Sequence, residues 1–381
     1  MKKIVGIVAA AALATSAFAE IGINSFNRAV FEPIHYNGDT LRSFQGPSWG
    51  VDEKAQTRAG LSFSIATENS GMNIDVNAEG VATGDNALVW VKPVEMLTVK
   101  FGRINDTLGR LDHCFGTWDL SRFADVCMQG EGFIVDRVRD GWGAEFKLEP
   151  VEGLVIDYNC TFNKNETDNH TYNVMWENSS TVIGYKADFG FIRAIINGQK
   201  AAKYSEKDSD TKPAAVIGLA ADITAVENLT LKIGAAIPTI LKAKDSAIRF
   251  GAGVDYALDA LTLHAQTELA IRAKKQNSDL DYDLGAFTAY VGAGVDFAFN
   301  DAWKLITDVR FNTYSGKAKE DGKDLKYEDP AFGAYIGLRQ QLSNASFDFG
   351  AQFGKRALKN QAAGKADDFA FAVPLTITAS F

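Results

Sequence analysis

Two small groups of residues in the sequence could do chemistry. Cys114 and Cys127 lie in the longest predicted connection, 104–141, and in an exported protein such a pair can form a disulfide; the alternative is two reduced thiols. His264 and Glu268 resemble a proton-transfer pair. However, four residues along a strand separate their side chains by roughly 13 Å, which is beyond hydrogen-bond reach. Neither group predicts a catalytic centre.

Motifs for metal binding and catalysis are weak throughout the chain. His113 stands beside Cys114, but no CxxC or HxxxH partner accompanies it, so no metal site is predicted. No nucleophile elbow or phosphate-binding glycine loop is present, so we predict neither an enzyme nor a cofactor. The formal net charge is -9, and nucleic-acid binding needs a basic stripe, so no nucleic-acid partner is expected.

Alternating hydrophobicity indicates the elements that must position any site. From Phe369 to Phe381, every second residue is apolar and the residues between are small or polar. Successive side chains on a strand face opposite ways, so this pattern predicts a strand with one apolar face. The strands predicted in this way run about 9–13 residues, which suits tilted membrane strands better than those of a soluble sandwich.

Short turns alternate with long polar connections, as in all-β transmembrane barrels with short periplasmic turns and long extracellular loops. The sequence predicts an antiparallel up-and-down barrel of about 18 strands, or of about 16 if 21–31 and 87–92 are not strands. Side chains can fill a barrel of only about 8 strands, so this one should have an aqueous lumen. The predicted strands lie near 21–31, 59–67, 72–78, 87–92, 97–103, 142–148, 154–162, 181–189, 191–197, 214–223, 229–237, 247–256, 261–271, 285–298, 303–314, 331–340, 345–354 and 369–381.

The first residues predict export. Met1 is followed by Lys2 and Lys3, then by an apolar stretch over 4–14 and a small-residue end at Ala17-Phe18-Ala19. This order is typical of a secretory signal peptide cleaved before Glu20, and the apolar part is too short to span a bilayer as a helix. We therefore expect residues 1–19 to be a Sec signal peptide and residues 20–381 to form the barrel.

Taken together, these features resemble Gram-negative outer-membrane porins. The resemblance depends on the signal peptide, the alternating strands and the terminal aromatic Phe381. In that superfamily a C-terminal aromatic is part of the signal read by the barrel-assembly machinery, so the resemblance implies that machinery and outer-membrane lipid as partners. A finer resemblance, to uncharacterised spirochaete porin-like barrels, covers Trp90 to Leu108. Neither resemblance assigns a functional site residue to this chain.

The predicted function is a passive pore for small hydrophilic solutes. Charges on the inward face could simply pair along a hydrated wall, or they could set up a transverse field in a constriction. The connection 104–141 is too apolar for a disordered segment, so we expect it to fold inward and set the pore size. The predicted pore-lining and constriction residues are Arg103, Arg110, Asp112, Arg122, Lys100, Arg249 and Arg310; a predicted acidic ring at the periplasmic mouth comprises Asp157, Asp188, Asp222, Asp255 and Asp296.

The main alternative is a surface-exposed structural or adhesive outer-membrane barrel, in which the loops carry the function. Conductance in planar bilayers separates the two hypotheses, because a closed barrel conducts nothing. The sequence leaves a homo-oligomer open and does not specify the solute.

Processing at the end of the signal peptide can be tested directly. Mass spectrometry of the membrane-inserted form should give an N-terminus at Glu20, because signal peptidase cleaves after a small-residue motif such as Ala17-Phe18-Ala19. A membrane form that retains Met1 would contradict this assignment.

Overall fold

The computed structural model describes most of the chain after the predicted signal peptide. The described residues are 20–36, 41–46, 58–77, 86–111, 140–161, 176–202, 212–239, 247–272, 276–277, 283–284, 287–312, 316–320, 323–327, 331–355 and 369–381. Within this part of the chain, no helix is long and apolar enough to cross a membrane.

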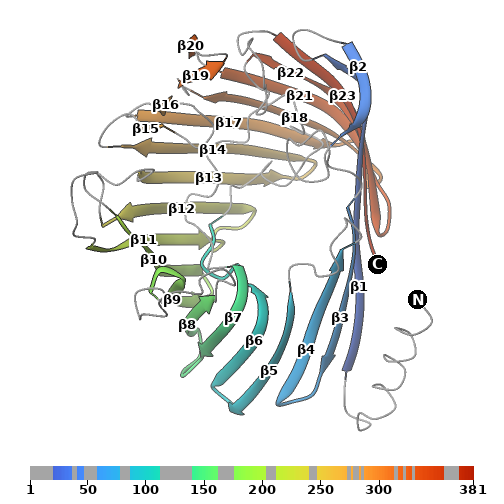
Figure 1. The fold of residues 1–381 in the computed structure, drawn as a ribbon. Helices are drawn as coiled ribbons and strands as arrows, with labels where there is room; N and C mark the ends of the chain where they lie inside the picture. Colours follow the sequence, from blue (N-terminus) through green and yellow to red (C-terminus); the bar gives the residue numbers. More distant parts are fainter. Residues whose placement is uncertain are drawn as a thin grey trace.

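One large antiparallel sheet closes on itself to form a barrel (Figure 1). The sheet has 19 strands; the short β2 (Leu41–Gly46) pairs with β1, and the other 18 form the barrel wall in chain order. This confirms the predicted number of strands and excludes 16. The wall strands are β1 (Glu20–Tyr36), β3 (Arg58–Ala66), β4 (Ser70–Asn77), β5 (Ala87–Val94), β6 (Leu97–Asn105), β7 (Asp140–Leu148), β8 (Leu154–Thr161), β9 (Ser179–Ala187), β10 (Gly190–Ala202), β11 (Lys212–Ile223), β12 (Leu229–Pro238), β13 (Ile248–Leu258), β14 (Leu261–Ile271), β17 (Phe287–Ala298), β18 (Trp303–Asn312), β21 (Ala331–Gln341), β22 (Ala345–Lys355) and β23 (Phe369–Ser380).

The barrel closes where the first strand meets the last. One edge of β1 pairs with β23 from Phe26 to Tyr36, and the other edge pairs first with β3 and then with β2. At the end of the chain, the backbone N–H of Ser25 donates to the carbonyl of Phe381 at 2.7 Å, and the N–H of Phe381 donates back at 3.1 Å. The terminal residue is therefore part of the closure.

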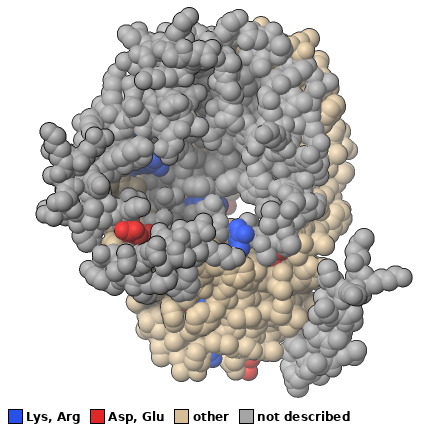
Figure 2. Space-filling model, viewed as in Figure 1, with Lys and Arg blue, Asp and Glu red and all other residues tan. Residues whose placement is uncertain are grey.

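The two faces of the wall differ in chemistry, as the alternation predicts. On β14, Leu263 is exposed on the outer face, whereas Gln266 and Glu268 are buried on the inner face. Exposed large apolar side chains occur on almost every wall strand, and the outer surface in Figure 2 carries few charged atoms, whereas blue atoms are visible inside the opening. An apolar exterior is what a lipid environment requires.

Tight turns join the strands at one end of the barrel. Asp259 lies in the turn between β13 and β14 with φ 47°, and Asn228 precedes β12 with φ 61°. Asp and Asn tolerate this left-handed region better than most residues because their short polar side chains bond the local backbone. Within the long connections at the other end lie two small hairpins, formed by β15 (Gln276–Asn277) with β16 (Asp283–Leu284) and by β19 (Gly316–Glu320) with β20 (Lys323–Tyr327).

The difference between the faces gives a stability prediction. Ile233, in the middle of β12 and 45% exposed on the outer face, would place a charge in hydrocarbon if changed to Lys. Ile233→Lys should lower the free energy of unfolding by about 2–4 kcal/mol, measured by denaturant unfolding in lipid vesicles. The control is Thr230→Lys on the inner face of the same strand, where the new charge joins Lys232 and is solvated. Equal destabilisation by both variants would mean that the outer face is not in contact with lipid.

Candidate pore lumen and the segment that enters it

The chain leaves the wall after β6 in a short, well-bonded turn. Asp106 accepts a hydrogen bond on Oδ1 from the backbone N–H of Leu108 at 2.7 Å, and the N–H of Arg110 donates to the carbonyl of Thr107 at 3.0 Å. An Asp side chain that bonds the backbone two residues on is the usual way to start such a turn. In Figure 1 the cyan segment that follows β6 lies inside the ring of strands.

This inward segment, defined as residues 106–111, packs against a distant part of the wall. Leu111 is fully buried with Val182 of β9, Ile195 of β10 and Ala220 of β11, and Leu108 packs against the same cluster. Burying one leucine side chain contributes about 1.5–3 kcal/mol. The segment therefore begins on β6 and is held against the inner faces of strands three to five positions further round the barrel.

A polar clamp lies beside this apolar cluster. The guanidinium of Arg193 donates from Nη2 to the backbone carbonyl of Arg110 at 2.5 Å. It also pairs through Nη1 with Asp222 Oδ2 at 2.5 Å and lies 4.8 Å from the ring centroid of Phe191. Arg193 is itself buried, so its position is fixed by these contacts and it holds the inward segment to the wall.

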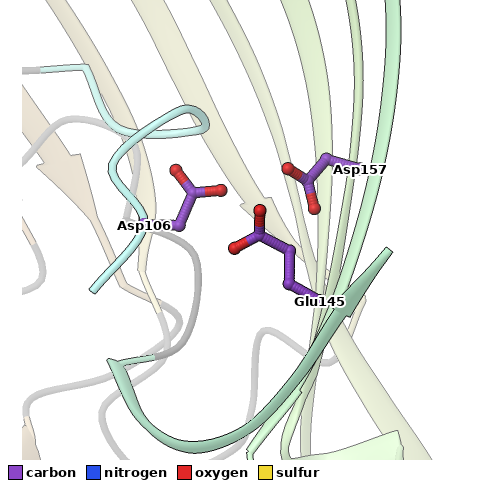
Figure 3. A group of neighbouring side chains, drawn as sticks. All are labelled: Asp106, Glu145 and Asp157. Atoms are coloured by element: carbon purple, nitrogen blue, oxygen red, sulfur yellow. The ribbon is translucent and has the colours of Figure 1, made fainter. Parts of the chain in front are cut away.

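Three carboxylates converge at the start of the inward segment. Asp106, Glu145 of β7 and Asp157 of β8 each offer an oxygen, and these oxygens all lie within 4.8 Å of one another (Figure 3). Lys100 Nζ of β6 is 2.5 Å from Glu145 Oε1. No metal site was predicted from the sequence, because the members of this cluster come from three elements that are separated along the chain.

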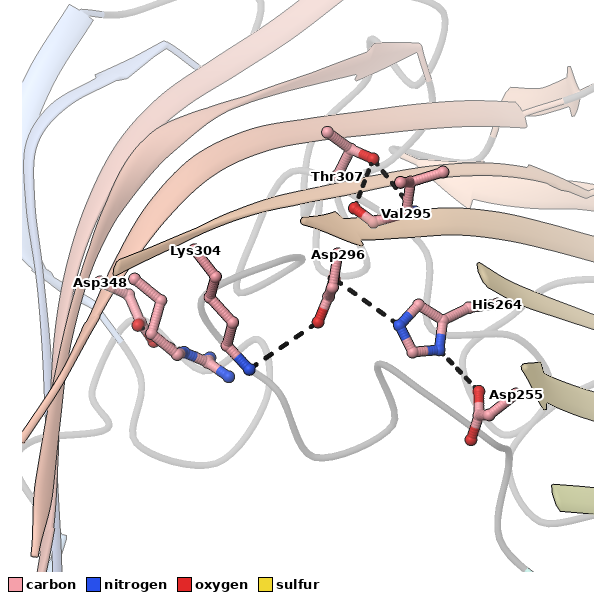
Figure 4. A network of polar contacts seen from close by, with 8 residues as sticks. Asp255, His264, Val295, Asp296, Lys304, Thr307 and Asp348 are labelled. Atoms are coloured by element: carbon pink, nitrogen blue, oxygen red, sulfur yellow. Dashed lines mark hydrogen bonds and ion pairs between the residues drawn. The ribbon is translucent and has the colours of Figure 1, made fainter. Parts of the chain in front are cut away.

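Charges of opposite sign pair across neighbouring strands elsewhere on the inner wall. His264 of β14 lies between two carboxylates: its Nδ1 is 2.6 Å from Asp255 Oδ1 of β13, and its Nε2 is 3.6 Å from Asp296 Oδ1 of β17. Lys304 of β18 then reaches Asp296 Oδ2 at 3.9 Å (Figure 4). Arg339 of β21 pairs with Asp348 of β22 in the same way at 2.6 Å, whereas Arg310 pairs with Asp308 on its own strand, β18, at 2.9 Å.

The predicted pore-lining residues have different locations. Lys100 lies on the inner face and pairs with Glu145, and Arg249 lies on the inner face of β13. Arg310 is also inward but is only 3% exposed, since it is buried against Asp308. Arg110 contributes its backbone carbonyl to the clamp described above.

The position of Arg103 does not decide its predicted role. In the ladder it lies between Ala87 of β5 and Trp142 of β7, and Trp142 is exposed. Its own side chain is only partly exposed, with Nε buried. A pore-lining role for Arg103 therefore stays a prediction. Asp112, Arg122, Cys114 and Cys127 lie outside the described residues.

The residues of the predicted acidic ring are mostly engaged with neighbours. Asp222 pairs with Arg193, while Asp255 and Asp296 share His264. Asp157 belongs to the carboxylate cluster, and Asp188 is exposed in the turn between β9 and β10. The register that creates these partnerships could not be read from the sequence.

Several solved structures share this architecture over nearly the whole of both chains. OccK10 (OpdN) of Pseudomonas aeruginosa has a TM-score of 0.53 at 11% identity, covering 95% of this chain and 99% of its own. OpdQ of the same organism has a TM-score of 0.52 at 9% identity, covering 95% and 98%. An anion-selective porin from Comamonas acidovorans matches with a TM-score of 0.48 at 12% identity, covering 95% and 100%. No protein-family model matches the sequence, and no curated protein matches it significantly.

The contacts of Arg193 should restrict the motion of the inward segment, and this can be tested. Hydrogen bonds from charged groups contribute about 1.5–3 kcal/mol, so Arg193→Gln should speed amide hydrogen exchange in residues 106–111 by about tenfold or more. Arg249→Gln, which removes an inward charge from β13, is the matched control and should leave exchange in this segment unchanged. If both variants exchange at the original rate, Arg193 does not hold the segment.

Proposed function

We propose that this chain, a porin-like outer-membrane β-barrel, is a passive pore through which small hydrophilic solutes diffuse. An 18-stranded barrel is too wide for its own side chains to fill. Its inner wall carries paired charges, which favour water and polar solutes over apolar ones. Its apolar outer face suits the outer membrane, to which we propose that the signal peptide 1–19 and the barrel-assembly machinery deliver the chain.

The observation that carries the proposal is the inward segment. Residues 106–111 begin the connection 104–141, and they are packed inside the barrel against Val182 and Ile195 on the inner wall. We propose that this connection narrows the lumen and so limits the size of the solutes that pass. Leu111 on the connection and Arg193 on β10, which bonds the carbonyl of Arg110, are both described residues, so the anchoring can be tested without reference to the rest of the connection.

The proposed mechanism is diffusion along a wall of fixed, compensated charges. The row Asp255, His264, Asp296 and Lys304 alternates acidic and basic side chains from strand to strand. Such a wall offers hydrogen bonds and local fields to a polar solute at every step but has no large net charge of either sign along that row. We therefore propose weak ion selectivity from this part of the wall.

Conductance tests the pore and the constriction separately. The wild-type barrel should form channels in planar bilayers. Deleting 112–130, or the double change Leu108→Ser with Leu111→Ser, should raise single-channel conductance, because either change frees the segment from the lumen or shortens it. Leu231→Ser, on the outer face of β12, is the control and should leave conductance unchanged.

The possible outcomes are distinct. A wild-type barrel that assembles but never conducts would overturn the pore and favour a surface-exposed structural or adhesive barrel. Variants that assemble, as judged by heat-modifiable migration, and keep the original conductance would overturn the constriction alone.

A further inference from the structure

The carboxylate cluster at the start of the inward segment has the geometry of a cation site. Asp106 comes from the segment, Glu145 from β7 and Asp157 from β8, and the three side chains point toward one another in Figure 3. Two oxygens on opposite sides of one ion at about 2.4 Å lie about 4.8 Å apart, and calcium binds oxygens at about 2.3–2.6 Å. The separations between these oxygens, all within 4.8 Å, therefore fit a single ion of that size.

The cluster is also short of positive charge. Glu145 and Asp157 are 0% and 1% exposed, and buried charges are costly unless they are paired. Lys100 pairs with Glu145 at 2.5 Å, and the nearby Lys147 is bound to Glu149 at 3.0 Å. Three carboxylates and Lys100 sum to a formal charge of -2 (three negative, one positive), which one divalent cation would neutralise.

A buried amide beside the cluster has unused hydrogen-bonding capacity. Asn159 is fully buried, lies two residues from Asp157 along the same face of β8 and is opposite Glu145 in the ladder. Its amide oxygen and nitrogen are without hydrogen-bond partners. Buried polar groups are normally satisfied, so an unmet amide oxygen beside these carboxylates indicates a ligand.

We propose that Asp106, Glu145 and Asp157 bind one divalent cation of the calcium class, with the amide oxygen of Asn159 as a further ligand. The donor set contains only oxygen, which selects hard cations such as Ca²⁺ and Mg²⁺ over zinc or copper. Calcium fits better than magnesium because magnesium requires oxygens at about 2.0–2.1 Å in near-ideal octahedral geometry. Water molecules would supply the remaining ligands, since calcium usually takes about six to eight oxygens.

The bound ion would tie the inward segment to the wall. Asp106 is the only ligand on the segment, and the other two carboxylates are on strands, so occupancy of the site cross-links them. This places a second anchor at the start of the segment, in addition to the cluster around Leu111 at its end. Any effect of the ion on permeation rests on the proposed pore function, but the binding itself does not.

Calcium binding to the refolded barrel in detergent tests the site without reference to conductance. Isothermal titration with CaCl₂ should show one saturable site per chain. Asp157→Asn, which keeps the shape of the side chain and removes its charge, should weaken binding at least tenfold. Asp348→Asn, on the inner wall beside Arg339, is the matched control and should bind as the wild type does. MgCl₂ in place of CaCl₂ should bind more weakly.

A second readout covers the case in which Asp157→Asn fails to fold. Asp106→Asn lies outside the strands and keeps the oxygen that accepts the N–H of Leu108, so it should fold and bind calcium at least tenfold more weakly. Calcium should also raise the temperature at which the wild type loses its folded electrophoretic migration, but not that of Asp106→Asn. No saturable binding by the wild type, or equal binding by Asp106→Asn and Asp348→Asn, would overturn the proposal. If the wild-type barrel does not conduct, the proposed pore function is wrong, but the proposed calcium site is unaffected.

Discussion

The whole structure depends on the need to satisfy backbone hydrogen bonds in a medium without water. Each unpaired N–H or C=O group in hydrocarbon costs on the order of several kcal/mol. A sheet can therefore span a membrane only if it has no free edge. The pairing of β1 with β23 meets this need, and the bonds between Ser25 and Phe381 extend it to the last residue. Closure in turn fixes which face of every strand meets lipid and which faces the lumen.

The inner wall of the closed barrel has two regions with different polar side chains. Between β13 and β18, opposite charges face one another on adjacent strands and compensate locally, as in the contact of His264 with Asp255 and Asp296. Near β7 and β8, carboxylates gather with too few cations. The inward segment contributes Leu111 to an apolar cluster and Asp106 to this acidic cluster, so its position depends on both hydrophobic packing and charge.

The wall strands could be predicted almost completely from the sequence because a two-residue period is a local signal. The bounds were less accurate where strands extend toward the long connections: β1 extends to Tyr36 and β10 to Ala202, past the predicted ends at 31 and 197. The short strand β2 was missed, since six residues beside a long loop carry little periodicity.

The candidate site was predicted less well, because its contacts depend on register. In the sequence, Glu268 on the same strand is the acidic residue that suggests a partner for His264, whereas its neighbours in the structure are Asp255 and Asp296 on adjacent strands. Sequence reasoning also treated the inner face as uniformly polar and so overlooked Val182 and Ile195, the apolar residues against which Leu111 packs. A signal for these two residues was available in the sequence. Both are apolar at positions that the alternation assigns to the inner face, where polar residues were expected.

The seam between β1 and β23 has a consequence for how the chain reaches its folded state. The two strands lie at opposite ends of the sequence, so neither can find its partner until the final residues have been exported. Until then the edge of β1 that β23 covers, from Phe26 to Tyr36, presents unpaired backbone groups, which are a ready template for pairing with another chain. The newly exported polypeptide is thus most exposed to aggregation in the interval before its last strand arrives, and a carrier that shields the first strand during that interval would protect it.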